Sequence, residues 1–132
     1  MQNREDESPP ESSIGLKTKV YLTDARGREC MGIGVVWLLQ KIESKGSIKK
    51  AAEEMGLSYA KAHRIICEAE EGLHTPLIHR RRGGDTRRGA DLTEEARLLI
   101  DEYSRLHNGI KKDASERFTE FLEKTGPALL NR

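Results

Sequence analysis

The spacing of apolar residues changes three times along the chain, and each change marks a different kind of element. Residues 17–23 alternate polar and apolar side chains, which is the two-residue period of a half-buried strand. Residues 24–27 have the composition of a turn, and residues 28–31 are long enough for a second strand. We therefore expect a small β-hairpin. The preceding residues 1–13 are acidic and nearly devoid of apolar side chains, which predicts a disordered lead.

After this hairpin the period lengthens to three or four residues, which is typical of helices that bury one face. Residues 32–44 predict a first helix that stops at Gly46. Ser47 predicts the N-cap of a second helix, which Gly56 ends, and Ser58 predicts the N-cap of a third that runs to about residue 71. The residues expected to face inward on the first and third helices are Val35, Val36, Leu38, Leu39, Ile42, Ala62, Ile65, Ile66 and Ala69.

A second hairpin with a strongly basic tip is predicted after the third helix. Pro76 favours an extended segment over residues 77–82, and a short apolar strand returns at Leu92. The stretch between them is rich in glycine, and residues 80–88 hold five arginines and one aspartate. Glycines permit a sharp tip and arginines reach phosphates or a minor groove, so this hairpin is a candidate wing.

A long helix is predicted from Thr93 onward. A glycine inside a helix costs about 1 kcal/mol relative to alanine, so we expect a kink or break at Asn108 and Gly109. Gly126 and Pro127 are expected to close the structured part. The apolar stripe is either intramolecular core or a dimer seam. About 30 residues would reach about 45 Å, longer than a small domain is wide, so part of the stripe needs a partner. The stripe consists of Ala96, Leu99, Ile100, Tyr103, Leu106, Ile110, Ala114, Phe118 and Phe121.

Residues 48–67 combine the residue types that the two crossing helices of a helix-turn-helix require. Ala52 is small where the helices approach, and Gly56 allows the left-handed backbone of a tight turn. Ala51, Met55, Leu57, Ala62 and Ile65 are expected to fill the wedge between them. The third helix would then present its first two turns to the base edges of a major groove. The candidate DNA-binding residues are Ser58, Tyr59, Lys61, His63 and Arg64 on this helix and Arg81, Arg82, Arg87 and Arg88 in the wing.

The net charge of +1 over 132 residues conceals an uneven distribution. Residues 1–13 and 91–124 each carry −3, whereas residues 45–90 hold ten basic and six acidic residues, or +4. A basic segment in an acidic chain is typical of nucleic-acid binding, although charge runs also merely solvate a face. The composition is that of a soluble globular protein, without an 18-residue apolar run or a secretory signal, so we expect a cytoplasmic protein without membrane contact.

Few residues of the sequence point to a disulfide, a metal site, catalysis or a cofactor. The two cysteines, Cys30 and Cys67, build neither a disulfide framework nor a four-cysteine zinc site, and Cys67, beside two isoleucines, is expected to be a small core residue. The four histidines lack the i, i+4 spacing of a metal site. Neither an ordered Ser-His-acid set nor a phosphate loop is present, so we expect no enzyme, no metal and no cofactor. Trp37 is expected in the core or an interface.

These residues resemble the amino-terminal DNA-binding domain of the molybdate-responsive ModE-type regulators, which is similar to the helix-turn-helix of LysR-type regulators. The resemblance covers residues 17–106. It is carried by GSIKKAAEEMGLSYAKA at 46–62, PLI at 76–78, GG at 83–84 and GADLT at 89–93. It implies a dimeric winged helix that binds a palindromic operator through the third helix and the wing, with the helix after the wing contributing to the dimer contact.

Two departures limit what the resemblance implies. His63 stands where the family often has tryptophan, and Thr86, Arg87 and Arg88 stand where family wings have further glycines, so the operator is not carried over. Full-length family members also have carboxy-terminal domains that bind the oxyanion. The sequence ends at Arg132, so molybdate sensing is not carried over either, and the effector is unknown.

The sequence thus predicts a mainly α fold with small β, namely a winged helix-turn-helix with an N-terminal β-hairpin and a long C-terminal helix. We expect an acidic lead at 1–13, the winged domain at 14–106, a helical extension at 107–124 that serves as a dimer element, and a tail at 125–132. The favoured function is sequence-specific binding of double-stranded DNA by a homodimeric transcriptional regulator. The alternative is a winged-helix protein-interaction module whose arginines only solubilise the surface.

Overall fold

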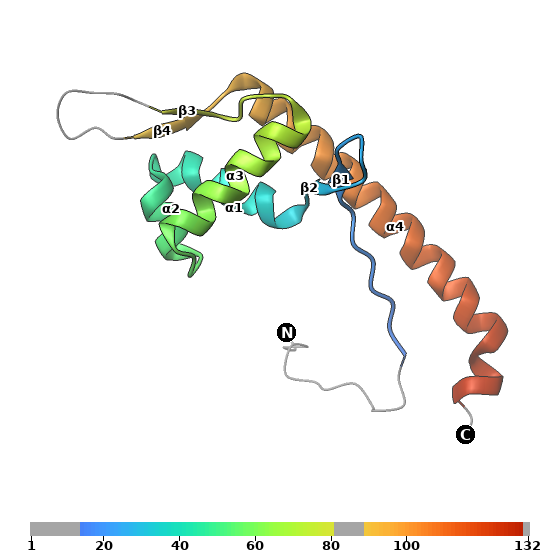
Figure 1. Ribbon diagram of the computed structural model, residues 1–132. Helices are drawn as coiled ribbons and strands as arrows, with labels where there is room; N and C mark the ends of the chain where they lie inside the picture. Colours follow the sequence, from blue (N-terminus) through green and yellow to red (C-terminus); the bar gives the residue numbers. More distant parts are fainter. Residues whose placement is uncertain (1–13, 81–88, 131–132) are drawn as a thin grey trace. The chain divides into compact units, whose positions relative to one another are not determined.

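The computed structural model describes residues 14–80 and 89–130, so the predicted lead at 1–13 lies outside the described residues. Two short strands are followed by three helices, two further strands and one long helix (Figure 1). The elements are β1 (Leu22–Thr23), β2 (Glu29–Met31), α1 (Ile33–Lys45), α2 (Ile48–Glu54), α3 (Tyr59–Leu73), β3 (Ile78–Arg80), β4 (Ala90–Leu92) and α4 (Glu94–Leu130). Both strand pairs are antiparallel. The predicted fold, a winged helix-turn-helix, is confirmed.

The chain forms two compact units. The larger unit, Lys19–His107, contains every element from β1 to the first part of α4. Of the described residues, 14–18 and 108–130 belong to the second unit. Among the described helices, we find no stretch with the length and hydropathy of a membrane span.

Serine hydroxyls begin two of the helices, as predicted. Ser47 Oγ accepts a hydrogen bond from the Lys50 amide at 3.1 Å, and Ser58 Oγ accepts one from the Lys61 amide at 3.0 Å. The first N–H groups of a helix have no partner within it, so each hydroxyl satisfies a donor that would otherwise depend on water. The beginnings of α2 and α3 therefore follow directly from the sequence.

Residues with left-handed backbone end α1, α2 and α3. Gly46 and Gly56 both have a φ of 70°, a conformation that glycine adopts without steric cost. The third helix runs to Leu73, slightly beyond the predicted end, and is capped by His74 with a φ of 54°. Gly56 turns the chain from α2 into α3 and so sets the crossing of the helix-turn-helix.

The core of the larger unit lies between α1, α2, α3, the base of the β3–β4 hairpin and the start of α4. Most of the predicted inward residues are buried, and Val35, Ile65 and Leu99 are half-buried against them. The alanines of α2 and α3 leave room for a close approach of the two helices. The buried residues named in the predictions are Val36, Leu38, Leu39, Ile42, Ala51, Ala52, Ala62, Ile66, Ala69, Leu92, Ala96, Ile100 and Tyr103.

The predicted break in the last helix is wrong. α4 is continuous from Glu94 to Leu130 and includes Asn108, Gly109, Gly126 and Pro127. A single glycine costs about 1 kcal/mol, which many uninterrupted backbone hydrogen bonds on both sides offset. The residue before a proline resists helical geometry partly through its Cβ, which Gly126 lacks, so this dipeptide does not end the helix.

Several residues predicted to face inward are exposed in the single chain. Leu106, Ile110 and Phe121 are 45%, 39% and 47% exposed, so the later part of the α4 stripe is not core. Trp37 is 56% exposed, which rules out its predicted place in the core and leaves an interface as a prediction. Period alone does not distinguish a face that packs on its own chain from one that faces solvent.

We predict that Gly56→Ala lowers the free energy of unfolding by about 1–2 kcal/mol, because a Cβ is unfavourable in left-handed backbone. Urea unfolding of the purified protein measures the change. The matched control is Gly34→Ala in α1. A Cβ meets open space at both positions, but only Gly56 has a positive φ, so the control is expected to be neutral or slightly stabilising. Equal losses for the two variants would contradict the prediction.

Candidate nucleic-acid interface

The predicted DNA-contacting residues of α3 lie on its solvent side. Ser58, Tyr59, Lys61 and Arg64 are exposed and His63 is half-buried. The opposite side of the helix carries the buried Ala62, Ile66 and Ala69. Because the helix turns through about 100° per residue, burial of that side leaves the first two turns of the other side free for a partner.

Three side chains at steps of four form a row along the exposed side of α3. The rings of Tyr59 and His63 are stacked with centroids 5.9 Å apart. The sulfur of Cys67 lies 3.7 Å from Nδ1 and 3.8 Å from Nε2 of His63. Cys67 is exposed, so its prediction as a core residue is wrong. The neighbouring Ile66 occupies the inward position, and the helical period excludes Cys67 from the same face.

Charge changes sign along α3. Its first turn contains no acidic residue, and Lys61 and Arg64 lie in the first two turns. Glu68, Glu70 and Glu71 all lie in the second half. The free N–H groups and positive dipole end at the beginning of a helix also favour anions. The N-terminal half of α3 is therefore the part suited to a polyanion.

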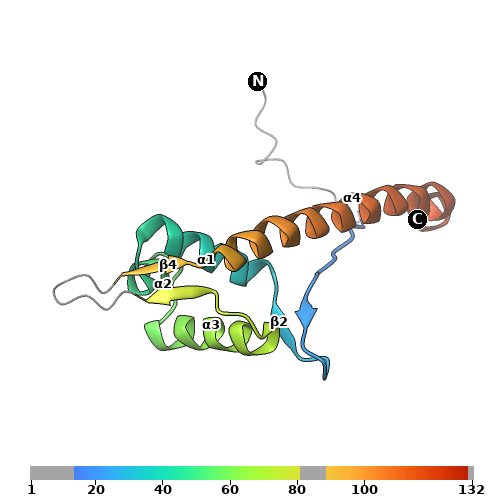
Figure 2. The same cartoon turned by 90° about the horizontal axis from the view of Figure 1, so that it is seen from above.

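The β3–β4 hairpin has a buried base next to this helix. Ile78, Leu92 and Ala90 are buried, whereas His79 and Arg80 are exposed. The register pairs Ile78 with Leu92 and Arg80 with Ala90. The predicted wing residues Arg81, Arg82, Arg87 and Arg88 lie outside the described residues. In two perpendicular views, the hairpin extends on the side of the domain where α3 begins (Figures 1 and 2).

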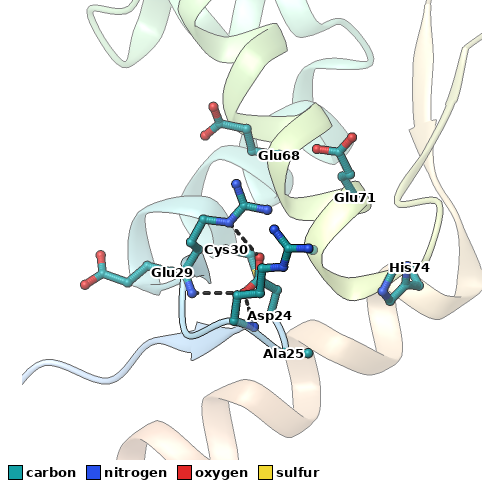
Figure 3. A pocket seen from close by; sticks show the side chains of 10 residues that line it. Asp24, Ala25, Glu29, Cys30, Glu68, Glu71 and His74 are labelled. Carbon is teal, nitrogen blue, oxygen red and sulfur yellow. Dashed lines mark hydrogen bonds and ion pairs between the residues drawn. The ribbon is translucent and has the colours of Figure 1, made fainter.

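A cavity of about 430 Å³ lies between the β1–β2 turn and the C-terminal half of α3 (Figure 3). Sequence reasoning did not find it, because its walls come from segments far apart in the chain. Its charged side chains are mixed, with acidic residues from both walls and two arginines from the turn. The lining residues are Asp24, Ala25, Arg26, Arg28, Glu29, Cys30, Glu68, Glu71, Gly72 and His74.

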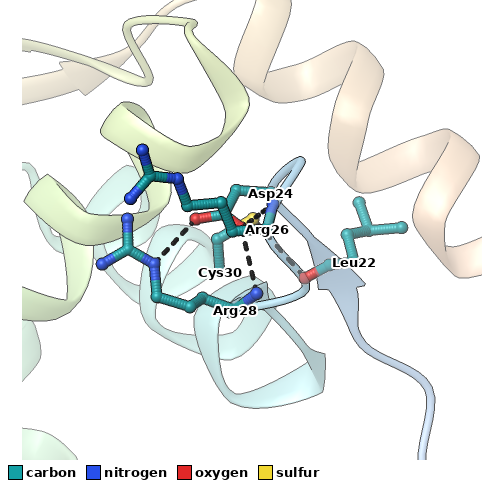
Figure 4. A network of polar contacts seen from close by, with 5 residues as sticks. All are labelled: Leu22, Asp24, Arg26, Arg28 and Cys30. Carbon is teal, nitrogen blue, oxygen red and sulfur yellow. Dashed lines mark hydrogen bonds and ion pairs between the residues drawn. The ribbon is translucent and has the colours of Figure 1, made fainter.

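Asp24 organises the turn that forms one wall of this cavity (Figure 4). Its Oδ1 accepts hydrogen bonds from the amides of Arg28 and Arg26 at 2.9 and 2.8 Å, and its Oδ2 accepts one from Arg28 Nε at 3.0 Å. These hydrogen bonds, led by that of the Arg28 amide, lower the pKa of the Asp24 carboxyl. The turn predicted at residues 24–27 is confirmed, but its packing beside α3 was not predictable from the turn itself.

Cys30 joins the first hairpin to α3. Its thiol donates to the Leu22 carbonyl at 3.4 Å, and burial, followed by the nearby Asp24 charge, raises its pKa. A Cβ on Gly72 of α3 would lie 2.5 Å from the Cys30 Cβ, so glycine is required for this close approach. Across residues 14–80 and 89–130, we find no group of three or more His, Cys, Asp or Glu side chains arranged to hold a metal ion.

The fold and this exposed helix define a winged helix-turn-helix domain. Residues 37–97 match the family model of the bacterial regulatory helix-turn-helix protein, lysR family. The chain is also 37% identical over 82 residues to the molybdenum-pterin-binding protein MopB of Rhodobacter capsulatus. That match covers 62% of this chain and 30% of MopB, so the chain spans less than a third of this relative.

Solved structures with the same fold support this class. The crystal structure of the CbnR DNA-binding domain with DNA has a TM-score of 0.53 at 17% identity, covering 68% of this chain and 98% of that one. The BenM DNA-binding domain with benA site 1 DNA has a TM-score of 0.50 at 20% identity, covering 67% of this chain and 98% of that one. Full-length CbnR with its target DNA has a TM-score of 0.51 at 20% identity, covering 65% of this chain and 29% of that one. These structures confirm the fold, and the matches to the lysR family model and to MopB confirm the predicted resemblance.

We predict that the two cysteines react with a thiol reagent at different rates. Cys67 is exposed beside an imidazole, whereas burial shields Cys30 and raises its pKa, which lowers the fraction of reactive thiolate. Time-resolved labelling followed by mass spectrometry of peptides is expected to show Cys67 modified several times faster than Cys30. Equal rates in the native protein would contradict this arrangement. Unfolding in urea is the control and should bring the two rates together.

Proposed function

We propose that this chain is a sequence-specific, dimeric transcriptional regulator that binds double-stranded DNA. The observation that carries the proposal is the exposed, cationic N-terminal half of α3, presented by a fold that CbnR and BenM DNA-binding domains also have in structures with DNA. A helix of this diameter fits the major groove, and its first turns then meet the base edges.

Each predicted residue of α3 has a chemistry suited to this role. Arg64 and Lys61 donate to guanine or to phosphate oxygens, and the guanidinium of Arg64 has the fork geometry for bidentate contact with guanine. Ser58 and His63 provide hydrogen-bonding groups, and Tyr59, 52% exposed, offers a ring that packs on the sugar-phosphate backbone. In this proposal, the α3 residues supply the specificity of binding.

The wing supplies affinity that depends little on sequence. Arg80 is exposed at the end of β3, and we assign Arg81, Arg82, Arg87 and Arg88 the same role, contact with phosphates or a minor groove. Charge-neutral variants of Arg87 and Arg88 also test the alternative function. A complex with a protein partner would survive their loss, whereas DNA binding would be weakened.

The exposed apolar residues of α4 support the proposal that a second copy of the chain binds there. Leu106, Ile110 and Phe121 expose large apolar side chains that a helical partner of matching shape would cover. We assign the segment 107–124 to this dimer contact. In a two-fold dimer the two α3 helices face half-sites of opposite orientation, about 34–36 Å apart. The operator is therefore an inverted repeat.

We predict that duplex binding weakens steeply with salt and that Arg64→Ala costs about 1–3 kcal/mol of binding free energy. Fluorescence anisotropy with a labelled duplex at several salt concentrations measures both. Arg105→Ala is the control, because Arg105 is an exposed arginine of α4 that pairs with Glu102 at 3.6 Å. Duplex binding no stronger than that of an unrelated acidic protein would overturn the proposal and favour the protein-interaction module.

We predict that selection of bound duplexes from a random pool enriches an inverted repeat, because symmetric dimers impose their symmetry on the site. Sedimentation of the free protein is expected to give the mass of two chains. Replacing Ile110 and Phe121 by serine is expected to shift the sedimenting species toward one chain. Enrichment of a single unrepeated half-site by a monomeric protein would contradict the dimer and leave DNA binding intact.

A further inference from the structure

Glu70 contacts both the turn that follows α3 and the start of the first strand of the β3–β4 hairpin. Its backbone carbonyl accepts a hydrogen bond from the Thr75 amide at 3.1 Å, beside the His74 cap. Its carboxylate Oε2 accepts two more, from the amides of Leu77 at 2.8 Å and Ile78 at 3.2 Å. One residue of α3 thus contacts the turn and the beginning of β3.

The donors on β3 require such an acceptor. Leu77 and Ile78 are 0% and 6% exposed, so the start of the strand is buried in the core. Buried amides without a partner are costly, and hydrogen bonds to a charged acceptor are shorter and stronger than neutral ones. Pro76, which precedes them, has no amide hydrogen and therefore needs no acceptor of its own. The carboxylate of Glu70 satisfies both adjacent amides with a single oxygen.

Other contacts attach the hairpin to different parts of the domain. Thr93, at the start of α4, donates through Oγ1 to the Pro76 carbonyl at 2.8 Å and through its amide to the Leu77 carbonyl at 3.0 Å. The Ala90 amide of β4 donates to the Gly46 carbonyl at 3.0 Å. These bonds hold the hairpin on the core, whereas those of Glu70 join it directly to α3.

We propose that Glu70 is a positioning residue of the DNA-binding surface, which fixes the spacing between the exposed side of α3 and the β3–β4 hairpin. Arg80, exposed at the end of β3, lies two residues beyond the Ile78 amide that Glu70 holds. A shift of the strand therefore moves this arginine relative to Lys61 and Arg64. The inference rests on the proposed DNA binding and adds a residue that does not itself touch DNA.

The sign of the expected effect separates positioning from simple electrostatics. Removing a carboxylate from a DNA-binding helix reduces repulsion of phosphates and by itself strengthens binding. Glu71 is the matched control, because it is exposed on the adjacent position of the same helix and its loss changes the charge equally. Glu71→Ala is therefore expected to leave binding unchanged or strengthen it slightly. Weaker binding of Glu70→Ala has to come from altered geometry.

The test compares the full chain with Glu70→Ala, Glu70→Gln and Glu71→Ala on one duplex selected with the unaltered protein. Glu70→Ala is expected to raise Kd by about five- to 150-fold, the effect of removing one good interaction with DNA. The plot of log K against log salt should become shallower by about 0.9 for each phosphate that the variant no longer neutralises. Glu70→Gln keeps an oxygen acceptor and is expected to restore most of the affinity and the slope.

The slope distinguishes positioning from a merely structural role. Loss of folded protein lowers the active fraction, which titration and circular dichroism measure, but leaves the slope of the remaining protein unchanged. If Glu70→Ala does not fold, Glu70→Asp replaces it, because its shorter side chain keeps the charge but not the reach. A folded variant with the affinity and slope of Glu71→Ala would overturn this inference alone. Absence of duplex binding by the unaltered chain would overturn the proposed function, and this inference with it.

Discussion

Burial of one side of α3 is the constraint on which the rest of the molecule depends. Ala62, Ile66 and Ala69 are completely buried, and the small alanines allow α2 to approach closely. A helix with one side fixed in a core has no freedom in what the other side presents. The exposure of Tyr59, Lys61 and Arg64 therefore follows from packing rather than from any contact that these residues make.

The parts of the fold that were predictable from the sequence depend on local interactions or on the helical period. The caps by Ser47 and Ser58 and the turn at Gly56 are local, because each depends on one side chain or one backbone conformation. The inward residues of α1 and α3 follow from period. Cys67 was wrongly predicted as a core residue because its two neighbours are apolar. The spacing of four residues places it on the same side of α3 as Tyr59 and His63.

The features that the sequence did not predict depend on contacts between distant segments. The cavity beside α3 needs the β1–β2 turn to pack on Gly72, and no property of the turn alone specifies that. In the sequence, Glu70 does not differ from an ordinary exposed helix residue. Its role is visible only when the structure places the start of β3 beside it. The continuity of α4 through Gly109 depends on the summed helix propensities and backbone hydrogen bonds of many residues. One unfavourable residue therefore does not break the helix.

The two halves of α3 consequently differ in their surroundings and in their charge. The C-terminal half lies between two hairpins, held to β2 by the close approach at Gly72 and to β3 by the carboxylate of Glu70. Its acidic residues are suited to accepting hydrogen bonds from the protein and unsuited to phosphates. The N-terminal half, which carries Lys61 and Arg64, meets solvent and has the positive end of the helix dipole. A helix anchored at one end and exposed at the other presents its cationic residues in one fixed orientation, which the proposed contact with base edges requires.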